Sequence, residues 1–337
     1  MLPSIDQAEG AEGLSLRARY ARFGNVGVLD LPAGDTVPAA IARLKATGRY
    51  EYVEPDYIRR ATASPVVPDD PQFTNQWALN NTGANGGRAG ADINAEAAWE
   101  TATGAPGVIV AVLDSGALTT HQDLAANMWV NPSPGTTASF NDSSAGFGTV
   151  QETDGVNGLN AVARTGSPTD DSSVGHGTHV SGIVGAVGNN GLGVSGVAWK
   201  VQLMELKFLD SSGQGTLSEE LPCIEYAIAH KVSAVNASFG DSTFSQAEMD
   251  AIQAAGKAGI IFVCGAGNSA EDNDISGFFP ADYPLDNIIG VGATDNRDGL
   301  AVFSDYGSGS VEIFAPGENV ISTINTSTSS YGYLSGT

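Results

Sequence analysis

The stretch VIVAVLDSG, residues 108–116, is the part of the sequence that decides the fold. Its first six residues, 108–113, form an unbroken apolar run, which is typical of a parallel strand buried on both faces. Asp114 ends this run and is followed by a small, turn-forming pair. Open parallel sheets bind their ligands at the carboxyl ends of their strands. This stretch therefore predicts a buried strand that carries a functional carboxylate at its end.

An alternation of apolar strands and amphipathic helices continues to the end of the chain. Further strands are predicted at 201–209, 260–264, 288–291 and 320–324, and helices at 176–187, 217–230 and 245–258. This order favours an α/β fold, a doubly wound and mostly parallel sheet with helices on both faces. Residues 131–173 show no clear periodicity and predict a long surface loop.

The first 64 residues predict a separate, small α+β domain. A strand at 26–31, a helix at 37–47 and a second strand at 50–58 are followed by a polar link at 59–64. The proline-rich stretch PVVPDDP then begins at residue 65 and favours an extended chain. We therefore predict two domains, residues 1–64 and residues 65–337.

Composition excludes several classes of protein. Hydrophobic residues make up 42% of the 337 residues, which allows a large core and excludes a disordered chain. Lys and Arg number 15 against 38 Asp and Glu, so the net charge is −23. Binding to phosphates needs clustered cations, so we expect neither a nucleic acid nor a membrane as partner. The two cysteines, Cys223 and Cys264, provide no disulfide framework, and both are predicted to be buried.

Neither a membrane span nor a signal peptide is predicted from the sequence. No apolar run reaches about 18 residues, and residues 1–6 lack the basic and apolar blocks of a signal peptide. The sequence alone leaves two interpretations open, an intracellular protein or a chain whose native start lies elsewhere.

Three polar residues are predicted to meet at one edge of the sheet. Asp114 follows the strand at 108–113, His176 opens a helix within GHGTHVSG (175–182), and Asn268 follows the strand at 260–264. Such a set is suited to acyl transfer. The carboxylate orients the imidazole, the imidazole takes a proton from a hydroxyl nucleophile, and the amide donates to the oxyanion that develops.

Two other enzymatic interpretations use the same residues. An aspartic protease would need a second motif like LDSG, and the nearest candidate, LDSSG at 209–213, contains one Ser too many. A metal hydrolase could use His176 and His179, which are spaced to share a helix face. However, no Glu lies between them, and no third ligand with zinc spacing is evident.

Four segments resemble the subtilisin-like serine proteases, the subtilases, over roughly residues 65–337. They are VAVLDSG (110–116), the segment around His176, NASFG (236–240) and the segment around Asn268, in the chain order of that family. The resemblance implies a serine endopeptidase in which Asp114 orients the general base His176 and Asn268 forms the oxyanion hole. It also implies two substrate-binding walls, one of Ser238, Phe239 and Gly240 and the other of Gly265, Ala266 and Gly267.

The resemblance places the nucleophile directly after Thr337. The family carries its serine in a Gly-Thr-Ser-Met-Ala segment, and this chain reads YLSGT at 333–337. Ser335 precedes the Gly-Thr pair and does not match the nucleophile. We therefore expect a domain truncated before its serine and inactive as given. The alternative is a catalytically dead, subtilisin-like binding module.

The resemblance also implies a structural calcium site. The carboxylates would come from Asp70 and Asp123, and the loop GNNGLGVSG (188–196) would supply the other oxygens. An all-oxygen set suits calcium better than zinc. A second, weaker site or a solvated acidic loop is expected at Asp154, Asp170 and Asp171. The ligands from the 188–196 loop would be the side chain of Asn190 and the carbonyls of Gly188, Leu192 and Val194.

Residues 14–62 resemble an inhibitor-type subtilase propeptide, with YVEPDY at 52–57 as the matching segment. The resemblance implies a secreted, monomeric zymogen that cleaves polypeptides and is inhibited by its own propeptide. Asp241 stands where the family usually has Gly. A carboxylate there would favour a basic substrate residue, and a solvent-facing Asp is the alternative.

Overall fold

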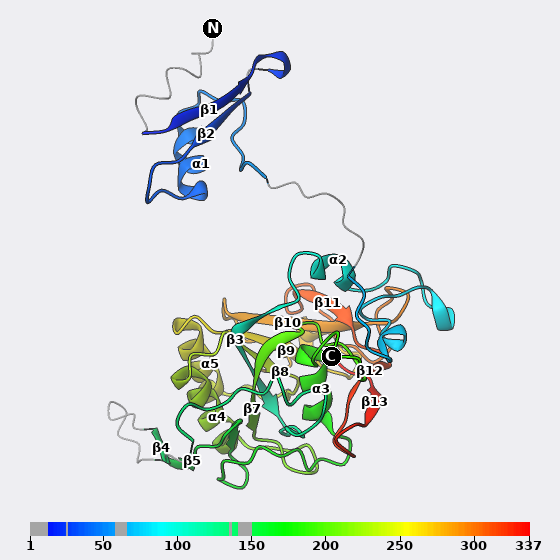
Figure 1. Cartoon of the computed structure of the whole chain (residues 1–337). Coiled ribbons are helices and arrows are strands. Elements are labelled where there is room, and N and C mark those ends of the chain that lie inside the picture. Colours follow the sequence, from blue (N-terminus) through cyan, green and yellow to red (C-terminus); the bar gives the residue numbers. More distant parts are fainter. Residues whose placement is uncertain (1–12, 25, 58–65, 135–136, 141–149) are drawn as a thin grey trace. The chain divides into compact units, whose positions relative to one another are not determined.

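The computed structural model describes residues 13–24, 26–57, 66–134, 137–140 and 150–337. The chain divides into two compact units, Met1–Ala63 and Ser64–Thr337, and each is described by itself. Figure 1 gives the element labels used below. The polar link predicted at 59–64 lies outside the described residues.

The smaller unit contains one hairpin and one helix. Strands β1 (Ser15–Tyr20) and β2 (Val26–Asp30) pair antiparallel. The 3-10 helix η2 (Ala21–Phe23) lies between them in the chain, and α1 (Val37–Ala46) follows β2. The side chain of Thr36 caps α1 by accepting from the Ala39 N–H. The prediction of a strand at 50–58 was wrong, because residues 50–57 form none. Pro55 has no N–H to donate to a ladder, and the partner of β2 is β1 instead.

The larger unit is built on a seven-stranded sheet in the order β11-β10-β9-β8-β3-β7-β6. Every neighbouring pair in this sheet is parallel. The predicted doubly wound α/β fold is therefore confirmed. The strands are β3 (Gly104–Asp114), β6 (Gly158–Asn160), β7 (Lys200–Lys207), β8 (Ala234–Ala237), β9 (Ile261–Gly265), β10 (Ile288–Thr294) and β11 (Ile313–Pro316).

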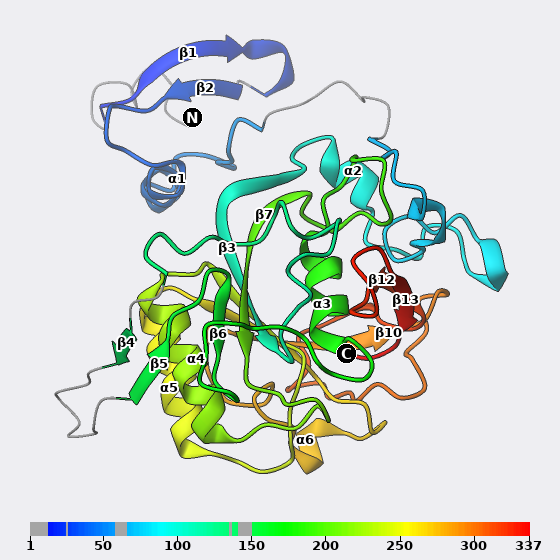
Figure 2. The ribbon, with the colours of Figure 1, turned by 60° about the horizontal axis from the view of Figure 1, so that its bottom comes forward.

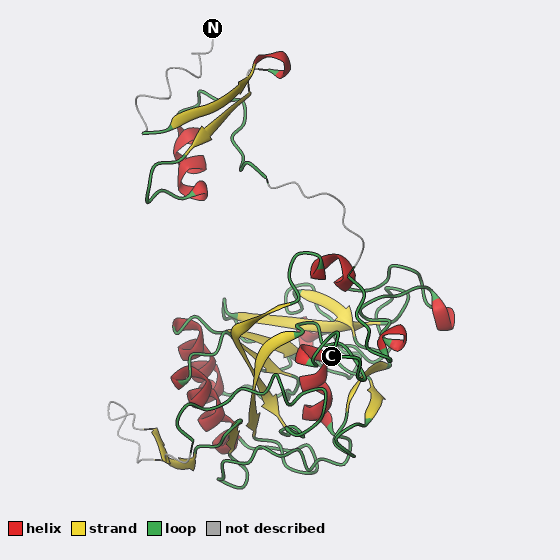
Figure 3. Cartoon of the chain, in the orientation of Figure 1, coloured by secondary structure: helices red, strands yellow, loops and turns green. Residues whose placement is uncertain are grey.

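Helices cover both faces of the sheet (Figures 2 and 3). The helices α4 (Leu217–Ala229) and α5 (Gln246–Lys257) lie together on one face, and α3 (His176–Gly185) lies on the other. Successive strand residues point to opposite faces. Accordingly Leu113 packs in the α4–α5 core, which contains Cys223 and Cys264, and Val112 packs in the α3 core. Both cysteines are buried as predicted.

Short elements complete this unit. The helices α2 (Ala95–Trp99) and α6 (Asn273–Ser276) and the 3-10 helices η3 (Phe73–Asn75) and η4 (Ala84–Gly86) lie in its loops. The predicted strand at 320–324 forms as β12 (Val320–Thr323), but it pairs antiparallel with β13 (Tyr331–Leu334) in a separate hairpin. An apolar run alone does not distinguish these two placements.

The prediction of one long loop at 131–173 was wrong in two places. Strands β4 (Thr137–Phe140) and β5 (Val150–Thr153) form an antiparallel pair, and β6 joins the main sheet beside β7. Leu159 in β6 is completely buried. Three or four residues are too few to produce a readable periodicity, so these strands left no signal in the sequence.

Strand β7 carries a buried carboxyl group, that of Glu205. This side chain is completely buried, and Ser181 Oγ of α3 donates to it at 3.0 Å. Burial, assisted by the charges of Asp114 and Asp170 and opposed by the Ser181 hydrogen bond, raises the pKa of Glu205 from 4.5 to about 8. Glu205 is therefore protonated in the folded protein at neutral pH.

We predict that Glu205→Gln raises the stability of the chain at pH 8. Between pH 4.5 and about 8 the folded state keeps a proton that the unfolded state releases. The free energy of unfolding therefore falls by up to about 1.4 kcal/mol per pH unit across this range. Glutamine does not titrate, so the variant should show a flatter profile in denaturant unfolding. Exposed Glu271→Gln is the control, and equal slopes in wild type and Glu205→Gln would contradict the prediction.

Candidate active site

The end of β3 and the start of α3 bring together an aspartate and a histidine. His176 Nδ1 lies 2.8 Å from Oδ1 and 2.9 Å from Oδ2 of Asp114. The side chain of Asp114 is 0% exposed, whereas that of His176 is 39% exposed. The carboxylate therefore holds one ring nitrogen from inside the protein, and the other, Nε2, is left for a reacting group.

Glycines allow this close approach of a helix to a strand end. A Cβ atom on Gly177 would lie 2.1 Å from the carbonyl oxygen of Gly116. Gly175, the N-cap of α3, has a φ of +68°, which favours glycine. Side chains at these positions would push His176 away from Asp114.

Opposing effects act on the pKa of His176. Burial lowers it, but the hydrogen bond and the charge of Asp114, together with the charge of Asp170, outweigh burial and raise the pKa above its usual value. The site therefore stabilises the protonated imidazole, which is the form that a general base adopts after it takes a proton.

Asn268 lies beside the same cavity, at the end of β9. The cavity has a volume of about 350 Å³, and His176, Asn268 and Thr337 all line it. Thr337 N donates to Asn268 Oδ1 at 3.0 Å, and Gly267 N donates to Thr337 Oγ1 at 3.0 Å. The structure thus brings the three predicted polar residues to one place, together with the last residue of the chain.

The two predicted substrate-binding walls also lie at this cavity. Ser238, Phe239 and Gly240 line one part of it, and Gly265 and Gly267 line another. Ala266 differs, because it is completely buried and is not among the lining residues. Its N–H donates to Val291 O of β10, which fixes the end of β9.

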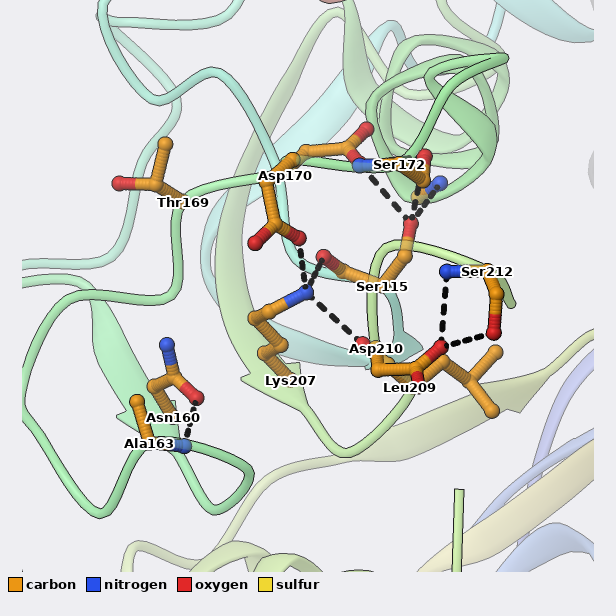
Figure 4. Close-up of polar contacts among 12 residues, drawn as sticks. Ser115, Asn160, Ala163, Thr169, Asp170, Ser172, Lys207, Leu209, Asp210 and Ser212 are labelled. Atoms are coloured by element: carbon orange, nitrogen blue, oxygen red, sulfur yellow. Dashed lines mark hydrogen bonds and ion pairs between the residues drawn. The ribbon is translucent and has the colours of Figure 1, made fainter. Parts of the chain in front are cut away.

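A set of hydrogen bonds that the sequence did not predict supports the turn after Asp114, and Figure 4 shows Ser115, Asp170 and Ser172 of this set. Asp170 is buried, and its Oδ1 accepts from Ser115 Oγ at 3.1 Å and from Ser172 Oγ at 2.6 Å. Its Oδ2 accepts from Thr178 N at 3.1 Å and from Thr178 Oγ1 at 2.6 Å. Ser115 Oγ also accepts from Gly177 N at 3.0 Å. One carboxylate therefore ties the turn after β3 to the first turn of α3.

A buried lysine also supports the turn after β3. Lys207 is 2% exposed, and its Nζ donates to Ser115 O and to Leu209 O, both at 2.8 Å. It also pairs with Asp171 at 2.8 Å. Figure 4 shows the ammonium group pointing at the turn that contains Ser115. A lysine within the apolar run 201–209 was the one signal of this contact in the sequence.

Neither interpretation of Asp154, Asp170 and Asp171 is correct for all three residues. Asp154 is buried and accepts from Tyr226 OH and Asn131 Nδ2, whereas Asp170 and Asp171 bind the partners described above. Their carboxylates therefore serve three separate sets of donors. A solvated loop is wrong for the buried Asp154 and Asp170.

The predicted cation ligands Asp70 and Asp123 converge on the loop at 188–194. Asp70 is 4% exposed and accepts from the N–H groups of Asn189 and Asn190 at 2.8 and 3.0 Å. Asp123 is completely buried and accepts from Val194 N at 2.9 Å and from Asn190 Nδ2 at 2.8 Å. Burial, assisted by the nearby charge of Asp70 and opposed by hydrogen bonds, raises the pKa of Asp123.

The donors at this loop fit a hard cation. Within the described part of the larger unit, no Lys or Arg pairs with Asp70 or Asp123. The hydrogen bonds of the described residues also leave unused the carbonyl oxygens of Gly188, Leu192 and Val194. Carboxylate and carbonyl oxygens are the ligands of Ca²⁺. The described residues contain no group of three or more His, Cys, Asp or Glu that could hold a metal, so carbonyl and amide oxygens would have to complete the set.

The other predicted groups lie apart from the Asp114–His176 pair. His179 is buried with Nε2 3.0 Å from Val320 O, and its burial lowers its pKa to about 4. Its ring is therefore not available to bind a metal together with His176, which argues against the metal-hydrolase alternative. Asp241 is exposed, accepts from Thr243 N at 2.7 Å and does not line the cavity.

Comparisons with known proteins identify the family of this chain. The model of the Subtilase family matches residues 105–337. The chain is 30% identical over 302 residues to "Thermophilic serine proteinase" of Bacillus sp. (strain AK1), which covers 89% of this chain and 63% of that protein. It is 34% identical over 310 residues to "Extracellular protease" of Xanthomonas campestris pv. campestris, which covers 87% of this chain and 49% of that protein.

A solved structure of proteases from Pseudoalteromonas arctica PAMC 21717 is similar as well. Its TM-score is 0.60 at 30% identity, over 80% of this chain and 82% of that one. The chain belongs to the subtilase family of serine proteases. It spans less than two thirds of the length of the two curated relatives above.

We predict that Asp170→Asn lowers the pKa of His176, because it removes one of the negative charges that raise it. Stability should also fall by about 1–3 kcal/mol, since the buried acceptor loses its charge. NMR titration of the imidazole and denaturant unfolding measure the two effects. Asp171→Asn is the matched control, because this neighbouring side chain is 62% exposed and contacts Lys207 instead. An equal pKa change in both variants would contradict a specific role for Asp170.

Proposed function

We propose that the complete protein is a serine endopeptidase that hydrolyses peptide bonds in polypeptides. One observation carries this proposal: His176, paired with Asp114, lines the same cavity as Asn268 and Thr337. The names of its relatives, a serine proteinase and an extracellular protease, support the same activity.

The proposed nucleophile is a serine directly after Thr337 in the complete protein. Its hydroxyl would stand near His176 Nε2, which takes the proton as the oxygen attacks the substrate carbonyl. Asp114 keeps the ring oriented through Nδ1 and stabilises the imidazolium. Asn268 donates from its amide nitrogen to the oxyanion. Thr337 N already binds Asn268 Oδ1, which leaves the Nδ2 group for this role.

The complete protein with His176→Ala should lose peptide hydrolysis almost completely. With Asn268→Ala, kcat should fall by about 10²–10³, which is the value known for the corresponding amide in subtilisin itself. Hydrolysis of a fluorogenic peptide, with and without a serine-reactive inhibitor, measures both variants. Asn75→Ala, an exposed side chain outside the cavity, is the control.

Two results would count against this proposal. A complete protein that binds peptides but cleaves none would indicate a non-catalytic module. Inhibitor-sensitive turnover by residues 1–337 alone would show that the nucleophile does not follow Thr337.

We further propose that Ca²⁺ binds Asp70, Asp123 and the 188–194 loop and stabilises the larger unit. A bound ion would neutralise the two buried carboxylates. It would also hold the loop against the segment around Asp70, near the start of the larger unit. Asn190 would have to turn its carboxamide, because Nδ2 now faces Asp123 and Oδ1 accepts from Leu192 N.

Calcium should therefore raise the melting temperature of the complete protein, and a chelator should lower it. At 100 times its Kd a bound ion contributes about 2.7 kcal/mol. Asp123→Asn should abolish the calcium effect in calorimetry, and exposed Asp286→Asn should not. Both are measured in the His176→Ala background to prevent self-digestion. A calcium response that survives Asp123→Asn would place the ion elsewhere.

We also infer that the smaller unit is the propeptide and that the protein is secreted as a zymogen. The α1–β1–β2 unit is compact by itself, as a folding aid and inhibitor needs to be. A relative named "Extracellular protease" supports export. Among the described residues, no helix is long and apolar enough to cross a membrane.

A further inference from the structure

A single aromatic ring lies between the two walls of the cavity. Phe278 is one of the lining residues. A Cβ atom on Gly240 would lie 2.2 Å from Cε1 of this ring, and one on Gly267 would lie 3.2 Å from its Cδ2. These two carbons are opposite corners of the ring. Phe278 therefore spans the gap between the Ser238–Gly240 wall and the Gly265–Gly267 wall.

Hydrogen bonds hold the backbone at Phe278 and at the residue after it. Phe278 N donates to Asp282 Oδ2 at 2.5 Å, and Phe278 O accepts from Asp282 N at 3.0 Å. The next residue, Phe279, exchanges two backbone hydrogen bonds with Asp241, at 2.8 and 2.9 Å. Its ring packs against Tyr283 with centroids 4.8 Å apart. The backbone of Phe278 is thus fixed by hydrogen bonds, and its ring packs closely against Gly240 and Gly267.

We propose that Phe278 is a specificity-determining residue that restricts the substrate residue before the scissile bond to small side chains such as Ala and Ser. The inference rests on the proposed function, because it takes the space between the two walls as the pocket for that side chain. A methyl or hydroxymethyl group fits above the ring, whereas a benzyl or isobutyl group would meet it. A clash of this kind discriminates more strongly than a weakened contact.

The charge of the lining argues against the basic substrate residue that Asp241 suggested. None of the described residues that line the cavity is Asp or Glu. Asp241 itself is exposed and accepts from Thr243 N. Behind Gly267 the carboxylate of Asp305 is 2% exposed, and its Oδ1 accepts from Ser269 N and Glu271 N. An arginine or lysine side chain would therefore lose its hydration at the pocket with no Asp or Glu among the described lining residues to pair with.

The test compares peptides that differ only in the residue before the scissile bond, with Ala, Phe or Arg at that place. Wild-type complete protein should cleave the Ala peptide with a kcat/KM at least about tenfold above the Phe and Arg peptides. Phe278→Ala should raise kcat/KM for the Phe peptide at least about tenfold and leave that for the Ala peptide little changed. Phe314→Ala, an exposed aromatic that does not line the cavity, is the control and should keep the wild-type profile.

Two further measurements keep the result clear if Phe278→Ala folds poorly. The wild-type profile needs no variant, and Phe278→Leu keeps an apolar side chain at the same place and should retain the preference for Ala. Wild-type cleavage of the Phe or Arg peptide as fast as the Ala peptide would overturn the inference and leave the protease assignment intact. No cleavage of any peptide would overturn the proposed function and this inference with it.

Discussion

The polar structure around the candidate active site is organised about one contact, the pairing of His176 with a completely buried Asp114. A carboxylate without water is costly unless hydrogen bonds and an opposite charge compensate it. Here the imidazole gives one contact and Ser115 N gives another, at 2.7 Å to Oδ1. Most of the nearby polar structure serves to hold these two donors. Lys207 fixes the turn from one side and Asp170 ties it to α3 from the other.

This requirement also shapes α3. The helix carries the histidine at its first residue, so it must lie directly against the sheet and under the β12–β13 hairpin. Its glycines make room: a Cβ on Gly182 would lie 2.3 Å from Thr323 Oγ1, and one on Gly185 would lie 2.5 Å from Val201 Cγ1. The polar side chain Ser181 is satisfied inside by Gly177 O and Glu205. Because α3 is buried on both its sheet side and its hairpin side, its residues are mostly small and the helix is only weakly amphipathic.

The sequence predicted the parts of the fold and the site that rest on long patterns. Apolar runs such as 108–113 identified the central strands. Because parallel sheets bind ligands at the carboxyl ends of their strands, Asp114, His176 and Asn268 were predicted to meet at one edge. Strands of three or four residues, such as β6 and β8, left no such signal. The structural role of Asp170 was not predicted, because its neighbours in sequence look like a solvated loop. Its partners Ser115 and Thr178 lie in other elements, so only the fold shows that its oxygens are enclosed.

A continuous set of contacts links the proposed cation loop to the end of the chain. Tyr331 of β13 donates to Asp123 Oδ2 at 3.0 Å, and its ring lies over Gly193, where a Cβ would come within 2.0 Å of the phenol oxygen. The strand that starts with Tyr331 pairs with β12 and leads to Thr337 beside Asn268. These contacts would connect an ion bound at the proposed loop to the residues that the proposed nucleophile would follow. Such an ion would act on the candidate active site through positioning, without touching a reacting atom.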